Sequence, residues 1–264
     1  MHHKITQALA AALLTAAAGA ALAVTPVASY QFNNSLAADQ AGAPALLAID
    51  PLAANGFETA VVKGVTETVY RWSGNGEFSS QQAGLTLDTR GLLTDNAAYT
   101  VAMTFEFAST APFGGGWRRL IDTEGRQSDN GFYVSPSQVL QAVQGNPIAD
   151  GSTTFTTPGF HDVMLSVAPE AGRQRVTAWL DGRQEFSVLS DVFTLANANN
   201  PNQLLTFFAD NLAAGAQQEF ASGRIASLAL YDGSFTPSTV PEPAAGLLML
   251  GGLAAVAWRR RRAC

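Results

Sequence analysis

Hydrophobic and polar residues alternate along this chain in short runs, and helical spacing is not sustained over any long stretch. The clearest run covers residues 99–107. Its apolar positions are Tyr99, Val101, Met103, Phe105 and Phe107. Because successive side chains of a strand point to opposite faces, this run predicts a half-buried antiparallel strand. Comparable runs occupy residues 61–72, 162–168, 175–180, 184–189, 204–208 and 224–231.

Glycine, proline, asparagine and threonine separate these runs at short intervals. Asp181-Gly182-Arg183 lies between two of them and predicts a hairpin turn, with the glycine where a positive φ is needed. About ten to fourteen short strands with frequent turn signals indicate an all-β protein, an antiparallel two-sheet sandwich.

The first residues have the pattern of a secretory signal peptide. His2-His3-Lys4 precedes an alanine-rich apolar run over residues 8–22, and Ala21-Leu22-Ala23 provides a small-x-small cleavage pattern. We expect a signal helix over residues 1–23 with cleavage after Ala23, and Ala28 is the alternative site. A core helix is the alternative interpretation of the run.

The last residues have three parts: a proline-rich linker, an apolar run and a basic cluster. Pro241 and Pro243 flank Glu242 and keep the linker extended, because proline fixes φ and lacks an N–H donor. Residues 244–258 are apolar or small and predict a short helix of about 22 Å, less than the roughly 30 Å of a bilayer core. The basic cluster is Arg259, Arg260, Arg261 and Arg262.

This tail resembles the PEP-CTERM sorting signal of Gram-negative bacteria that make extracellular polysaccharide. The resemblance covers residues 238–264 and implies cleavage near the Pro-Glu-Pro motif by exosortase, a membrane-embedded transpeptidase. The arginines are expected to stay on the cytoplasmic side of the inner membrane. The body of the protein would then be exported, anchored transiently, and delivered to the outer surface or extracellular matrix. A plain C-terminal membrane anchor is the alternative.

Removal of both ends changes the charge and the cysteine content. The whole chain has 15 basic and 21 acidic side chains, and the predicted cuts leave 10 and 20, a net charge of −10. So acidic a domain is not expected to bind nucleic acid or an anionic membrane surface. The lone Cys264 lies in the removed tail, so the mature domain would contain no disulfide.

Several segments of residues 24–237 resemble the LamG-like, concanavalin A-like jelly rolls. They are residues 30–39, 99–107, 120–122, 131–134, 160–163, 176–182 and 220–231. The resemblance implies a jelly-roll domain in which the first and last strands are neighbours in one sheet. Residues 233–239 and Phe160 depart from the usual family pattern.

No catalytic constellation is evident. His161 is the only histidine outside the signal peptide, so neither a Ser/His/Asp arrangement nor a histidine zinc site is supported. The clusters around Asp122 and Glu124 and between Glu67 and Glu77 lack the spacing of paired glycosidase carboxylates. A structural histidine and a non-catalytic protein are therefore expected.

Calcium is the candidate cofactor. LamG-like folds hold this ion near a sheet rim, and Asp210 and Asn211 follow a predicted strand, with Asp39 as a further ligand. The alternative is that these residues occur there as turn formers.

The glycine-rich loop at residues 111–117 is the candidate ligand site. Trp117, Arg118 and Arg119 together would offer a stacking surface and hydrogen-bond donors to a sugar. The alternative is a loop whose tryptophan packs on the core, as we expect of Trp72 and Trp179. The sequence thus favours a structural or adhesive surface protein that binds extracellular polysaccharide. A glycan-active hydrolase or lyase on the same fold is the alternative.

Overall fold

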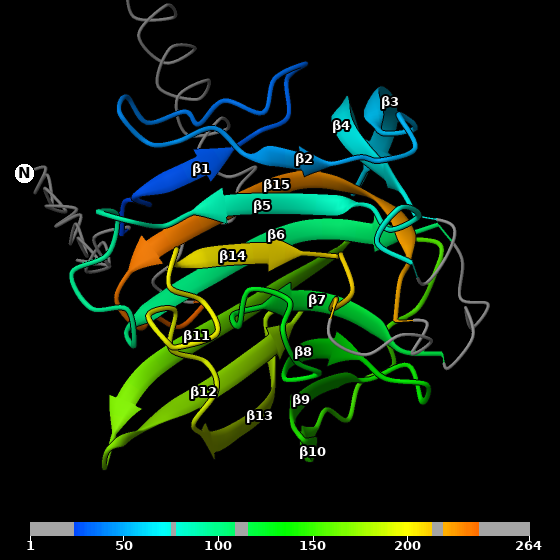
Figure 1. Cartoon of the computed structure of the whole chain (residues 1–264). Helices are drawn as coiled ribbons and strands as arrows, with labels where there is room; N and C mark the ends of the chain where they lie inside the picture. Colours follow the sequence, from blue (N-terminus) through cyan, green and yellow to red (C-terminus); the bar gives the residue numbers. More distant parts are fainter. Residues whose placement is uncertain (1–23, 75–77, 109–115, 213–218, 238–264) are drawn as a thin grey trace, which may run out of the picture.

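The computed structural model of the protein describes residues 24–74, 78–108, 116–212 and 219–237 (Figure 1). These ranges contain fifteen strands in two antiparallel sheets, which confirms the expected all-β sandwich. None of their segments is a helix long and apolar enough to cross a membrane. The helices predicted for residues 1–23 and 244–258 and the loop at residues 111–115 lie outside the described ranges.

Sheet A has eight strands and sheet B has seven. The order in sheet A is β13 (Arg183–Ser190), β12 (Arg173–Leu180), β11 (His161–Glu170), β6 (Tyr99–Phe107), β15 (Ser222–Asp232), β4 (Val65–Ser73) and β3 (Gly56–Val62), and β1 (Ala28–Tyr30) also pairs with β15. The order in sheet B is β10 (Asn146–Asp150), β9 (Leu140–Gln144), β8 (Gly131–Val134), β7 (Arg118–Asp122), β14 (Leu204–Phe207), β5 (Gly84–Asp88) and β2 (Leu47–Ile49).

Aromatic rings from both sheets fill the core between them. Trp72 of β4 stacks on Phe208, just after β14, with ring centroids 3.9 Å apart. Phe105 and Phe107 of β6 pack around this pair, and the Trp72 Nε1–H donates to the Ala221 carbonyl oxygen over 3.0 Å. Burial of each such side chain stabilises the fold by roughly 1.5–3 kcal/mol. The prediction that Trp72 belongs to the core is confirmed.

The first and last strands are neighbours, as the family resemblance implied. Ala28 of β1 pairs with Leu230 of β15, and Tyr30 pairs with Leu228. Strand β1 ends after three residues because Phe32 and Asn34 adopt positive φ. Both ends of the domain therefore lie at β15, in the middle of the strand order of sheet A.

The run at residues 61–72 forms two strands instead of one. Lys63 and Gly64 have φ of 48° and 88°, and they turn the chain between β3 and β4. Positive φ at both central residues is the geometry that two-residue hairpins require. The alternating pattern continues across the turn, so periodicity alone did not reveal it.

Strand β6 is buried on both faces, so the prediction that this strand is half-buried was wrong. Its inner residues face sheet B, but Thr100, Thr104 and Glu106 on the other face are also at most 6% exposed. The Thr100 hydroxyl donates to the carbonyl oxygen of Gly233, and Glu106 accepts from the backbone N–H of Gly159. Chain segments that follow β15 and precede β11 thus cover the centre of sheet A.

Replacement of Gly223 by alanine is expected to destabilise the domain by at least about 2 kcal/mol, because overpacking of a filled core has this cost. A Cβ at Gly223 would lie 2.3 Å from the Glu106 carbonyl oxygen and 2.5 Å from the Trp72 ring. The matched control is Gly56→Ala, where a Cβ meets nothing within 4 Å and the change should stay within about 0.5 kcal/mol. Urea unfolding of both variants measures the difference, and equal midpoints would contradict the close approach of β15 to Trp72.

Candidate functional site

An apolar row crosses the outer face of sheet A, which is the face turned away from sheet B. The register places Trp179 of β12 opposite Met164 of β11, Met164 opposite Ala102 of β6, and Ala102 opposite Ala229 of β15. These four residues and Tyr231 form a cluster separate from the main core. The two alanines are small, so the middle of this row leaves space above the sheet.

A row of hydroxyl groups lies beside the apolar row. Ser187 of β13, Thr177 of β12, Ser166 of β11 and Thr100 of β6 are opposite one another in register. The Thr177 and Ser187 hydroxyls are 3.0 Å apart, and the Thr100 hydroxyl is 3.2 Å from that of Ser166. The outer face therefore presents hydrogen-bonding groups next to an apolar surface.

Residues 233–236, which we call the strap, cross this face after β15 ends. The Phe235 N–H donates to the hydroxyls of Thr100, over 3.0 Å, and Ser166, over 3.2 Å. The Ser234 hydroxyl lies 2.7 Å from that of Ser166. The Phe235 ring packs edge-on against Tyr231, with centroids 6.2 Å apart. These contacts fix the strap over the centre of the sheet.

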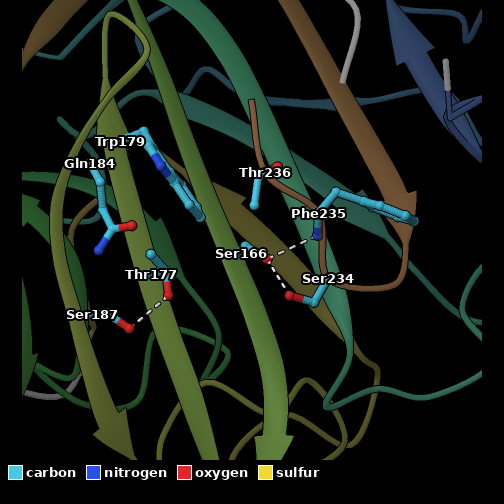
Figure 2. Close-up of a pocket in the computed structure, with 8 residues that line it drawn as sticks. All are labelled: Ser166, Thr177, Trp179, Gln184, Ser187, Ser234, Phe235 and Thr236. Carbon is cyan, nitrogen blue, oxygen red and sulfur yellow. Dashed lines mark hydrogen bonds between the residues drawn. The ribbon is translucent and has the colours of Figure 1, made fainter. Parts of the chain in front are cut away.

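A hollow of about 340 Å³ lies between the strap and strands β12 and β13. Its lining residues are Ser166, Thr177, Trp179, Gln184, Ser187, Ser234, Phe235 and Thr236. In Figure 2 the strap residues lie on one side and Gln184, Thr177 and Ser187 on the other, with the Trp179 indole between them. Among the described residues the lining contains no charged side chain, and it combines two aromatic rings with hydroxyl and amide groups. Such a surface suits an uncharged ligand rich in hydroxyl groups.

A second hollow of about 300 Å³ lies where β4 and β15 pair, and its charges are already matched. Arg71 donates to Glu58 over 3.1 Å, and Arg224 lies 3.5 Å from Glu58 and also pairs with Glu106. The Arg224 guanidinium lies 5.8 Å from the centre of the Phe160 ring. Because each arginine already has an acidic partner, this hollow has little net charge to offer a ligand.

The expected platform of Trp117, Arg118 and Arg119 does not lie open on the surface. Arg118 and Arg119 begin β7 and are fully buried. The Arg118 guanidinium lies 5.0 Å from the centre of the Phe107 ring, and Trp117 packs edge-on against Tyr133 at 5.7 Å. The two arginines thus pack inward, whereas Trp117 is half-buried against Tyr133 and does not belong to the main core, so we do not place the ligand there.

Arg119 of β7 is the centre of a buried ionic cluster in sheet B, separate from the main hydrophobic core. Its guanidinium donates to Asp122 over 2.8 Å and to Glu219 over 3.1 Å, and it lies 3.9 Å from Asp210 and 4.7 Å from the centre of the Tyr133 ring. Burial raises the pKa of Asp122 and raises that of Glu219 to about 7, since the ionised carboxylates lose solvation.

The calcium site at Asp210, Asn211 and Asp39 stays a prediction, and the structure places Asp210 and Asp39 in two separate polar groups. Asp210 accepts from the backbone N–H of Asn211 over 2.6 Å and from that of Glu219 over 3.2 Å, and Arg119 lies beside it. Asp39 instead accepts from the Ser29 hydroxyl over 2.7 Å, within a different polar group. Calcium takes 6–8 oxygen ligands. Among the described residues, no three His, Cys, Asp or Glu side chains are arranged to hold a metal.

His161 is a partly exposed structural residue at the start of β11. Its Nδ1 lies 2.6 Å from Asp181 and its Nε2 lies 2.8 Å from the Thr156 carbonyl oxygen. Burial alone lowers the pKa of His161, but the Asp181 carboxylate outweighs this effect and the pKa lies above its ordinary value. Lys63 pairs with Asp162 in the same group.

Sequence reasoning missed the hollow because it assigned Trp179 to the core. The Trp179 side chain is only 7% exposed, but it lies on the outer face of sheet A, with Met164 and Phe235. The signal that was available is the pattern Thr177-Ala178-Trp179, in which Trp179 shares a face with the polar Thr177. The strap contacts join residues far apart in the sequence and could not be found from local spacing.

Comparison with known proteins identifies the tail. Residues 239–262 match the model of the PEP-CTERM protein-sorting motif, which confirms the resemblance of the tail. The matched segment contains the Pro-Glu-Pro motif, the apolar run and the four arginines. The motif indicates an exported protein that exosortase processes, as in Gram-negative bacteria. No curated protein sequence matches the chain.

Solved structures of similar fold include two of botulinum neurotoxin. One is of type C and was reported with the finding that cell entry of this toxin depends on two ganglioside molecules. Its TM-score is 0.50 at 10% sequence identity, and the match covers 80% of this chain and 48% of the neurotoxin chain. The other is the binding domain of serotype D/C, with the same TM-score and identity over 80% and 49%. This chain thus spans about half the length of the neurotoxin chains. A Trypanosoma rangeli sialidase in complex with sialic acid has a TM-score of 0.47 at 14% identity, over 69% and 28%. The neurotoxin structures are consistent with a concanavalin A-like jelly roll.

Replacement of Glu219 by glutamine is expected to flatten the dependence of stability on pH. The folded-state pKa of about 7 lies above the ordinary value of 4.5, so the stabilisation is complete below pH 4.5 and is lost as the pH rises through 7. The loss is at most about 1.4 kcal/mol per pH unit between these values. His161 contributes a change of the same sign near and above pH 6.5, but it is present in both proteins and cancels in the comparison.

Urea unfolding of the wild type and Glu219→Gln at several pH values between 5 and 8 measures this difference. We expect the two free energies of unfolding to diverge as the pH rises, with the wild type losing more. Parallel curves would show that Glu219 is already ionised at pH 5 in the folded protein.

Proposed function

We propose that this is an exported, non-catalytic surface protein that binds uncharged segments of an extracellular polysaccharide in the hollow beneath the strap. The observation that carries the proposal is the lining of this hollow, in which Trp179 and Phe235 accompany hydroxyl and amide groups without a charged side chain. Sugar rings have apolar faces that pack on aromatic rings and hydroxyls that pair with such groups. The neurotoxin structures support the proposal only through their fold.

Four paired acidic groups support a binding role over catalysis. In the described part of the chain, Glu58, Glu106, Asp162 and Asp181 each pair with a basic side chain. Hydrolysis of a glycosidic bond uses two carboxylates placed on either side of the scissile bond, with one protonated to act as an acid. Carboxylates held in ion pairs are poorly suited to both roles, so the hydrolase or lyase alternative is less favoured.

The route to the surface follows from the two ends of the sequence. Signal peptidase would recognise Ala21 and Ala23 and release the N-terminus. Exosortase would then cut near Pro241, Glu242 and Pro243 while residues 244–258 remain in the inner membrane with the arginines in the cytoplasm. The domain of residues 24–237 would thereafter reside at the outer surface or in the extracellular matrix.

Replacement of Ser187 by tryptophan is expected to weaken polysaccharide binding by at least about tenfold, equivalent to ~1.4 kcal/mol. The new side chain would fill the hollow from β13, where Ser187 is exposed and where aromatic residues are tolerated. The matched control is Ser137→Trp, which makes the same change at an exposed serine in the turn between β8 and β9 of sheet B. Affinity electrophoresis in gels containing extracellular or neutral plant and bacterial polysaccharides measures the binding.

Equal retardation of both variants would place the ligand elsewhere. Release of new reducing ends from the polysaccharide, lost in Glu106→Gln, would instead favour the hydrolase alternative.

Replacement of Pro241 and Pro243 by alanine is expected to block processing of the tail. The linker could then become helical, and an extended segment would no longer be presented to exosortase. Mass spectrometry of protein from cells with an active exosortase should show a wild-type product without the four arginines, whereas the variant keeps the mass up to Cys264. An identical, processed mass for both would contradict the role of the motif, and Pro237→Ala is the control outside it.

A further inference from the structure

Both ends of the described domain pack on the same patch of the outer face. Val24 and Phe235 each contact the cluster of Ala102, Met164, Trp179, Ala229 and Tyr231. Val24 is the first residue after the expected signal cleavage, and Phe235 belongs to the strap. The two places where the body is joined to its removable ends therefore meet beside the hollow.

The connection from the hollow to the membrane segment is short. Thr236 lines the hollow, and seven residues separate it from Ala244, where the apolar run begins. A fully extended chain covers at most about 3.3–3.6 Å per residue, so Ala244 lies within roughly 28 Å of Thr236. Pro237, Pro241 and Pro243 also restrict the directions that this linker takes.

The strap fixes the point at which the described chain ends. Its hydrogen bonds to Thr100 and Ser166 hold Ser234 and Phe235 against the centre of sheet A. The described chain therefore ends one residue after Thr236, which lines the hollow on the outer face, and the sandwich, with sheets about 10 Å apart, lies behind that face. The signal peptide would leave from Val24 on the same patch before it is cut.

We propose that the outer face of sheet A is turned toward the lipid surface for as long as the C-terminal segment is in place. The hollow is then shielded from long polymers in the anchored precursor and becomes accessible when the tail is cut. Processing would thus release the protein and activate its binding site in one step. The activation of the binding site rests on the proposed function, whereas the orientation of the domain at the membrane does not.

Polymer access to two engineered cysteines tests the orientation without any glycan. Ser187→Cys places a thiol at the hollow and Ser137→Cys places one on sheet B, each in a full chain that also carries Cys264→Ser. The chains are reconstituted in phosphatidylcholine vesicles and treated with a small maleimide or with a long poly(ethylene glycol) maleimide. We expect the polymer, and not the small reagent, to label Ser187→Cys more slowly than Ser137→Cys.

A spacer variant is the control for the tether. A Gly/Ser insert of about 20 residues after Pro237 adds a root-mean-square reach of roughly 25 Å, and it should remove the difference between the two positions. Equal polymer labelling of both cysteines without the spacer would overturn the proposal, as would a difference that the spacer leaves unchanged. Failure of the full chain to float with the vesicles would also overturn it, because the tail would not hold the domain at a membrane.

These outcomes are separate from those of the proposed function. Labelling that shows the expected orientation, together with a Ser187→Trp variant that still binds polysaccharide, would keep the orientation and reject the hollow as the ligand site.

Discussion

The hydrogen-bonded register of sheet A is the constraint on which the candidate site depends. It brings Trp179, Met164, Ala102 and Ala229 into one row across four strands. A shift of one residue in any of these strands would turn its outward side chains into the core. A bulge between Ala178 and Trp179 determines which residue of β13 lies opposite Trp179. It places Gln184 there, whereas an unbroken ladder would place Glu185 there. Glu185 instead accepts from the backbone N–H groups of Ser152 and Thr153, over 2.6 and 2.8 Å. The uncharged lining of the hollow is thus a consequence of one irregularity in the ladder.

Local periodicity predicted the longer strands of this fold, and the family resemblance added several of the short ones. The run at residues 99–107 coincides with β6, the segment at residues 131–134 that carried the family resemblance coincides with β8, and the turn at Asp181 and Gly182 joins β12 to β13 as expected. The failures have physical reasons. The hairpin at Lys63 and Gly64 preserves alternation on both sides of its turn, and the second face of β6 is buried by distant segments that its own pattern does not register.

The polar residues were harder to place from sequence than the strands. Arg118 and Arg119 follow a glycine-rich stretch, which suggested an exposed loop, yet both lie inside β7. Buried arginine is uncommon unless it is paired, and the partners of Arg119 come from Asp122, Asp210 and Glu219, up to 100 residues away. The same pairing places Asp210, a predicted calcium ligand, next to Arg119. The carboxylate does face a cation, but that cation is a guanidinium supplied by the chain itself.

Charge distribution explains why a neutral hollow is compatible with so acidic a domain. The net charge of −10 expected for the mature domain acts at long range and disfavours acidic polymers. Salt screens exposed charges beyond about 8 Å at physiological ionic strength, so a polymer in contact with the hollow is affected mainly by the charges within that distance. Short-range selection then depends on the lining, and charged groups such as Asp162 with Lys63 and Asp181 with His161 are already paired. Pairing lowers the field that they project onto a ligand while the ion pairs help to hold the strands in place. A hydroxyl-rich, uncharged segment is therefore the chemistry that both the long-range and the short-range electrostatics of this face permit.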